Sequence, residues 1–189
     1  MLEGIIVIVL IVVLVGIALW AIAIYNGLVA RRQRTAEAWS GIDVQLKRRA
    51  NLVPNLVETV KGYAGHEQKT LAEVTEMRTR VRDAEGGGVA ERAQAESAMS
   101  GALMRLFAVA EAYPELRANQ NFLDLQDELS GLEDQIQMAR RYYNGAVRDL
   151  NTMIESFPSN LVANRFGFRQ AEYYEVDGAA DRAVPEVKF

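Results

Sequence analysis

The chain has 189 residues, enough for one domain of ordinary size once a membrane segment is set aside. It has no cysteine, which excludes disulfides and thiolate chemistry, and a single histidine, so a conventional metal or cofactor site is not expected. The formal net charge of -4 argues against a nucleic-acid partner, because neutralising phosphates requires a clustered excess of basic residues.

The first two dozen residues read as a membrane anchor. Every residue from Gly4 to Ile24 is apolar or glycine, and about twenty such residues span the roughly 30 Å hydrocarbon layer as a helix. A cleaved signal peptide is the competing interpretation, but it needs a basic start and a shorter apolar core, and this chain begins with Met1-Leu2-Glu3. We predict a short flank over residues 1–3 and an uncleaved transmembrane helix over residues 4–25.

Basic residues just beyond the span predict its orientation. Arg31, Arg32 and Arg34 follow it, whereas only Glu3 and the amino terminus precede it. Because flanking cations are retained in the cytoplasm, we expect the N-terminus outside and the following domain inside the cell.

A helix is expected to continue from the anchor. Trp39, Ile42, Leu46 and Val53 form an apolar stripe with spacings of three, four and seven residues, and no Gly-Pro break separates them from the span. Pro54 predicts a boundary, because proline disfavours a helical residue before it and suits the first turn of a new helix.

A second helix should therefore run from about Pro54 to the glycines at 86–88, and a third from about 89 to 113, closed by Pro114. The last helix carries the most regular pattern, a heptad seam that requires a helical partner. Its members are Phe122, Leu125, Leu129, Leu132, Ile136, Ala139, Tyr143, Ala146, Leu150, Met153 and Phe157.

These elements predict an all-α fold. A single N-terminal transmembrane helix continues into an elongated antiparallel bundle of three to four helices over residues 26–157. The remainder, 158–189, is expected to be an irregular tail.

Residues for catalysis are scarce. His66 lacks a second ligand at helical spacing, so a surface histidine is the better interpretation. The glycines at 86–88 lack the Lys-Ser/Thr of a phosphate loop and are read as a helix connector. Glu128, Glu133 and Asp134 are read as the solvated face beside the seam. The sequence thus predicts no catalytic site, no cofactor and no metal site.

Two sets of residues are candidates for contacts. The basic triplet Lys47-Arg48-Arg49 can meet anionic lipid or an acidic partner, or it can be a solvated helix segment. Trp39 can fill a pocket between subunits or pack in the core of its own bundle. Both alternatives stay open for each set.

Several segments together closely resemble the LemA family of bacterial membrane proteins. They are residues 25–29 (YNGLV), 38–49 (AWSGIDVQLKRR), 53–63 (VPNLVETVKGY), 66–67 (HE), 121–123 (NFL), 142–144 (YYN), 157–160 (FPSN) and 185–189 (PEVKF). The resemblance implies an N-terminal anchor followed by a helical domain, and it brings no agreed catalytic residues.

The leading hypothesis is a membrane-anchored scaffold or interaction protein at the bacterial inner membrane. It would contact membrane lipid, form a homo-oligomer or recruit a protein partner of unknown identity, and catalyse no reaction. The alternative is a non-catalytic or site-sharing subunit of a membrane enzyme complex, which copurification with a stoichiometric enzyme would favour.

Overall fold

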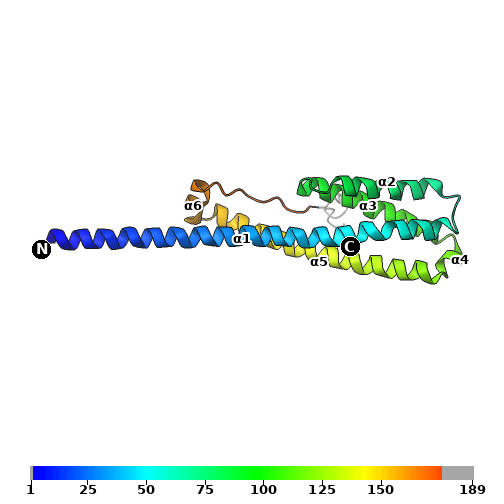
Figure 1. Ribbon diagram of the computed structural model, residues 1–189, viewed down its shortest axis with the longest axis horizontal. Coiled ribbons are helices and arrows are strands. Elements are labelled where there is room, and N and C mark those ends of the chain that lie inside the picture. Colours follow the sequence, from blue (N-terminus) through cyan, green and yellow to red (C-terminus); the bar gives the residue numbers. More distant parts are fainter. Residues whose placement is uncertain (1, 176–189) are drawn as a thin grey trace, which may run out of the picture. The chain divides into compact units, whose positions relative to one another are not determined.

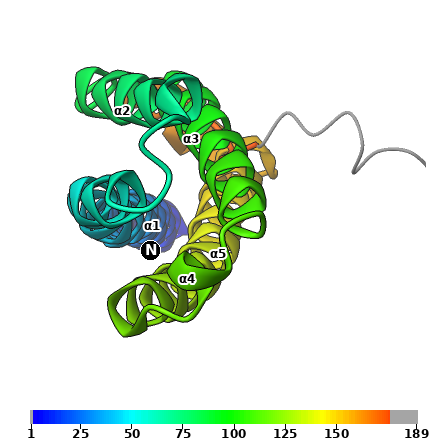
Figure 2. The same cartoon turned by 90° about the vertical axis from the view of Figure 1, so that its right-hand side faces the viewer.

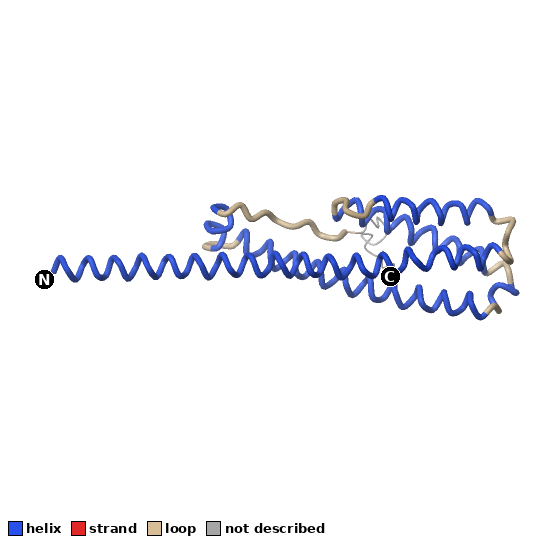
Figure 3. Tube along the Cα trace, viewed as in Figure 1, coloured by secondary structure: helices blue, strands red, loops and turns tan. Residues whose placement is uncertain are grey.

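The computed structural model describes residues 2–175, and every regular element in that part of the chain is a helix (Figures 1 and 3). The prediction of an all-α fold is confirmed. The elements are α1 (Leu2–Lys61), α2 (Gln68–Asp83), α3 (Val89–Ala110), α4 (Pro114–Arg117), α5 (Gln120–Glu155) and α6 (Ser159–Arg165). The chain divides into two compact units, Met1–Ser40 with Arg141–Glu172 and Gly41–Arg140 with Tyr173–Phe189, so α1 and α5 contribute to both.

The first third of α1 is long and apolar enough to cross a membrane, and no other helix in the described residues meets that test. Side chains from Leu2 to Trp20 are exposed throughout this stretch. Such a surface is unfavourable in water and favourable in lipid, so the observation fits a membrane-crossing helix, and its bounds at residues 4–25 stay a prediction.

In the first unit, the end of the apolar stretch packs against α5 and α6. Leu28 is fully buried among Leu150 and Ile154 of α5 and Val162 and Ala163 of α6. The expectation of an irregular tail from residue 158 was therefore wrong for Ser159–Arg165. A seven-residue helix is too short to show a reliable period, and burial of one face stabilises it. Residues 176–189, including the family-like 185–189, lie outside the described part.

In the second unit, the C-terminal part of α1, α2, α3 and the N-terminal part of α5 run antiparallel in chain order (Figures 1 and 2). Short connections favour this arrangement. One apolar cluster fills the space between them, with contributions from all four helices: Val53, Leu56, Val60, Ala64, Leu71, Val74, Met77, Val81, Met99, Ala102, Leu103, Leu106, Ala110, Leu116, Phe122 and Leu129.

The predicted boundary at Pro54 is wrong, because α1 passes through this residue. Proline has no backbone N–H, so the carbonyl four residues earlier, that of Ala50, loses its helical partner. The Nε–H of Arg78 on α2 donates to the Ala50 oxygen at 2.9 Å. A side chain from the neighbouring helix thus supplies the donor that proline lacks.

The helix instead ends at Lys61, which splits the predicted second helix. A turn over residues 62–67 contains Gly62 and Gly65, two poor helix formers, and its Tyr63 is exposed. Buried apolar residues return in α2, where Leu71, Val74 and Val81 face the core.

The heptad seam of α5 is confirmed over most of its length. Its members from Phe122 to Met153 are buried or half-buried. Phe157 is the exception, since it follows the end of α5 at Glu155 and is 79% exposed.

Candidate functional site

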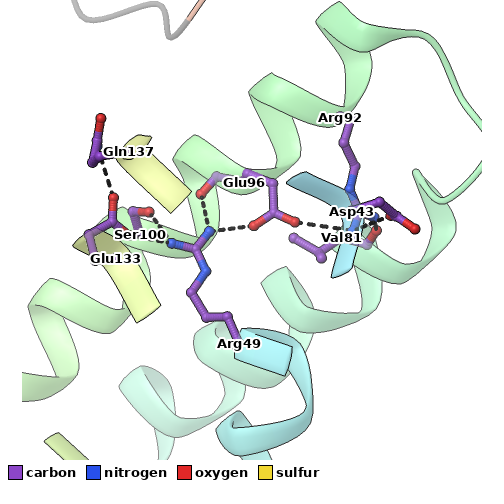
Figure 4. A network of polar contacts seen from close by, with 8 residues as sticks. All are labelled: Asp43, Arg49, Val81, Arg92, Glu96, Ser100, Glu133 and Gln137. Carbon is purple, nitrogen blue, oxygen red and sulfur yellow. Dashed lines mark hydrogen bonds and ion pairs between the residues drawn. The ribbon is translucent and has the colours of Figure 1, made fainter. Parts of the chain in front are cut away.

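The most unusual feature of the second unit is a network of charged side chains inside the bundle (Figure 4). Arg49 comes from α1, Arg92 and Glu96 from α3, and Glu133 from α5. Arg49 is 2% exposed, Arg92 1% and Glu96 0%. Charged groups are almost never buried this deeply unless they are paired.

Arg49 connects three helices. Its Nη1 donates to Glu133 Oε2 at 2.8 Å and to Ser100 Oγ at 3.0 Å. Its Nη2 donates to the Glu96 carboxylate and to the Glu96 backbone oxygen, the latter at 3.3 Å. The planar guanidinium suits this work, because its fixed fork of donors can serve several acceptors at once.

Arg92 extends the network toward the N-terminal end of α3. Its Nη1 donates to the carbonyl oxygen of Val81 near the end of α2. Its Nη2 lies 3.4 Å from Glu96 Oε1 and 3.5 Å from Asp43 Oδ1. Glu96 is thus held between two guanidinium groups, and the chain of charges ties α3 to α1, α2 and α5.

Burial raises the pKa of the Glu96 carboxyl, and the charges of Arg49, Arg92 and Arg140 oppose that rise. The net direction is upward because desolvation penalises the ionised form more than the guanidinium groups favour it. Near the network, Arg140 lies over the Tyr174 ring with its Cζ 4.8 Å from the centroid, and burial raises the pKa of that phenol.

The helical period places these charges. In α1, Ile42, Leu46, Arg49, Val53 and Leu56 follow spacings of four and three, so Arg49 occupies a core position of the stripe. Helix α3 repeats the pattern at its N-terminal end, where Arg92 and Glu96 precede Met99, Leu103, Leu106 and Ala110. Arg92 and Glu96 were not among the predicted site residues, because apolar spacing alone does not pick out charged side chains, although their own spacing was a usable signal.

The arrangement is suited to fixing helix register. Glu96 has no exposed surface, and its partners are side chains of the same bundle. Residues 2–175 contain no group of three His, Asp or Glu side chains that could hold a metal ion. We expect this network to favour one packing arrangement over its alternatives, because a shifted register would leave charges unpaired.

The structure separates Arg49 from the rest of the basic triplet. Lys47 is exposed and pairs with Asp43 at 2.7 Å, a contact that raises the pKa of Lys47. Arg48 is also exposed and donates to Gln45 at 3.4 Å. Arg49 points into the network and is not on the surface where lipid or a partner would meet it. A contact role for Lys47 and Arg48 stays a prediction.

Trp39 lies in the first unit, half-buried, with its ring 5.4 Å from that of Tyr143 and an interplanar angle of 56°. This contact is packing within the chain, and the proposed contact between subunits stays a prediction.

His66 is exposed in the turn after α1. Glu133, expected on the solvated face, has a side chain that is 39% exposed, and it also pairs with Arg49 and accepts from Gln137 Nε2 at 3.0 Å.

Comparisons with known proteins identify relatives that cover most of the chain. The model of the LemA family matches residues 38–189. Magnetosome protein MamQ 2 of Paramagnetospirillum magneticum is 27% identical over 184 residues, covering 85% of this chain and 68% of that protein. Protein LemA of Metamycoplasma hominis is 28% identical over 160 residues, and the match covers 80% of this chain and 72% of that protein.

Proposed function

Because the chain belongs to the LemA family, we propose that it is a membrane-anchored helical scaffold that self-associates or recruits partner proteins at the bacterial inner membrane. The observation that carries this proposal is the composition of α1. Its first third is apolar and exposed, whereas Leu28, Ile42, Leu46 and Leu56 further along are fully buried. One continuous helix thus supplies both the lipid-facing segment and part of the folded core.

The buried ionic network supports a structural role for the bundle. Arg49 and Arg92 each form an ion pair with Glu96, and Arg92 also donates a hydrogen bond to a neighbouring helix. A scaffold needs a bundle with a single defined packing, because the surfaces that it presents must be constant. The network supports such a packing.

The test is copurification from native membranes in a mild detergent. Two differently tagged copies of the full chain are expressed together, and one tag is captured. We expect the second copy or a membrane partner to copurify in a fixed ratio. The control carries Arg at Ile11 and Val12, two exposed residues of the apolar stretch, and should lose the interaction together with the anchor.

Two results would contradict the proposal. A wild-type chain that copurifies with neither a second copy nor a fixed-ratio partner is not a scaffold. Copurification with an enzyme whose activity depends on this chain would instead favour a subunit of a membrane enzyme complex.

A further inference from the structure

The connection between α5 and α6 presents large apolar side chains to the surroundings. Phe157 is 79% exposed, and Leu161 and Phe166 are each 59% exposed. The opposite face of α6 is buried through Val162 and Ala163. Leu161 lies in α6 and the two phenylalanines flank it, so three large exposed apolar side chains gather around a short helix whose Val162 and Ala163 pack inward, which indicates an interface rather than a solvated surface.

This connection lies beside the end of the apolar stretch of α1. Val162 and Ala163 belong to the cluster against which Ala21 and Ile24 pack. Ala21 precedes the last apolar residue of the stretch by three positions, which is about 4.5 Å along a helix. The Phe166 ring contacts that of Tyr25, with the centroids 4.9 Å apart. In a membrane, α6 would therefore lie level with the boundary between acyl chains and headgroups (Figure 1).

The charge of the segment fits the same boundary. Residues 157–170 contain Arg165 and Arg169, both exposed, and no acidic residue. Arg32 of α1 adds a guanidinium 5.3 Å from the centroid of Phe168. Exposed cations beside aromatic rings suit anionic headgroups, which attract basic residues near the membrane surface.

We infer that residues 157–170 form a second membrane contact, lying in the plane of the interface beside the anchor and facing anionic lipid. Phe157 and Leu161 enter the boundary of the acyl chains, and Arg165 and Arg169 meet phosphate groups, as in other interfacial helices. The inference rests on the proposed function, since it requires that α1 cross the bilayer.

The natural absence of cysteine permits a direct test on the full chain. Four single-cysteine variants, Phe157→Cys, Leu161→Cys, Ile11→Cys and Met104→Cys, are labelled with an environment-sensitive fluorophore. They are then reconstituted into vesicles of phosphatidylethanolamine and phosphatidylglycerol. Nitroxide-labelled lipid and aqueous iodide serve as the two quenchers. Ile11 is the lipid reference, and Met104 of α3, which is 72% exposed, is the aqueous reference.

We expect the labels at 157 and 161 to be quenched several-fold more by nitroxide lipid, and less by iodide, than the label at 104. The same quenching as at 104, with position 11 in lipid, would overturn this inference alone. Protection from both quenchers would also overturn it, because a protein surface would then cover the segment. A position 11 open to iodide would refute the anchor itself.

A second arm tests the charges. Arg165→Gln with Arg169→Gln, and separately the omission of phosphatidylglycerol, should each reduce nitroxide quenching at 157. Quenching that is unchanged in both cases would overturn the assignment of these arginines to anionic lipid.

Discussion

At the scale of single residues, Glu96 shows what a buried charge costs and what it contributes. Its carboxylate is held by Arg49 and Arg92, yet burial still raises its pKa. Replacing a buried ion network with apolar groups of the same shape is often neutral for stability, whereas removing one member strands the others. The contribution of Glu96 to the free energy of unfolding should therefore be seen in a variant that leaves its partner arginines in the core without it.

The first prediction concerns that loss. Glu96→Ala leaves two buried guanidinium groups without their carboxylate and should lower the free energy of unfolding by about 3 to 5 kcal/mol. Glu96→Gln keeps a hydrogen-bond acceptor and should cost much less. Urea unfolding of the full chain in detergent, followed by circular dichroism, measures both. Exposed Glu128→Ala is the matched control and should be nearly silent; equal losses at 96 and 128 would mean that the network stabilises nothing.

The second prediction is a pH dependence. Because the pKa of Glu96 is higher in the folded than in the unfolded chain, the native state binds this proton more tightly. Its contribution to stability is therefore full below the unfolded value, about 4.3, and is lost as the pH rises through the raised folded value. Subtracting the pH profile of Glu96→Gln from that of the wild type should show stability falling over this window; a difference that rises instead would reverse the direction of the shift.

The sequence contains a signal for this site that the spacing of apolar residues alone does not reveal. Arg49, Arg92 and Glu96 stand at core positions of their helices, so the helical period alone would have flagged them as buried charges. Their pairing across α1, α3 and α5 could not be predicted, because it depends on how the helices align.

At the scale of elements, the extent of the helices was predictable and some of their ends were not. The helix over α3 and the seam of α5 followed directly from apolar spacing. Pro54 misled because its cost to the helix is offset by Arg78, a residue 28 positions from Ala50 on another helix. No local pattern announces such a donor. Helix α6 was not predicted, because its stability comes from packing against α1 and α5 within the first unit and not from a pattern in its own seven residues.

The third prediction tests the seam. Leu132→Ala and Ile136→Ala each remove a side chain with almost no exposed surface, and each should cost about 2 to 5 kcal/mol. Met138→Ala is a suitable control, because Met138 lies on the same helix and is 54% exposed. Thermal unfolding in detergent measures the three variants. A melting temperature unchanged by the first two would mean that the seam serves association instead of the monomer core.

At the scale of the whole molecule, a helix long and apolar enough to cross a membrane was predictable from length and hydropathy, and the family was predictable from its motifs. Binding partners were not predictable, because exposed side chains show which surface of the protein is available but do not identify the molecule that binds there. The predicted direction of insertion rests on Arg31, Arg32 and Arg34, which follow the span.

The fourth prediction addresses that direction. A cysteine at Gly88, which is exposed and where an added Cβ would meet no other atom within 4 Å, should resist an impermeant thiol reagent in intact cells. It should react once the cells are permeabilised, and Leu2→Cys should react in intact cells. Labelling at 88 without permeabilisation would reverse the predicted orientation.

Self-association is the part of the proposed scaffold that a single measurement tests most directly. Anchored chains share one plane, and this confinement raises their effective concentration, so a modest lateral affinity suffices for assembly. The measurement is the number of photobleaching steps per particle for the full chain, labelled at Gly88→Cys and extracted with its native lipid at several expression levels. We predict several steps at every level, with fewer steps for Trp39→Ala than for the exposed neighbour control Tyr142→Ala if Trp39 lies between subunits. Single-step bleaching at all levels would contradict self-association.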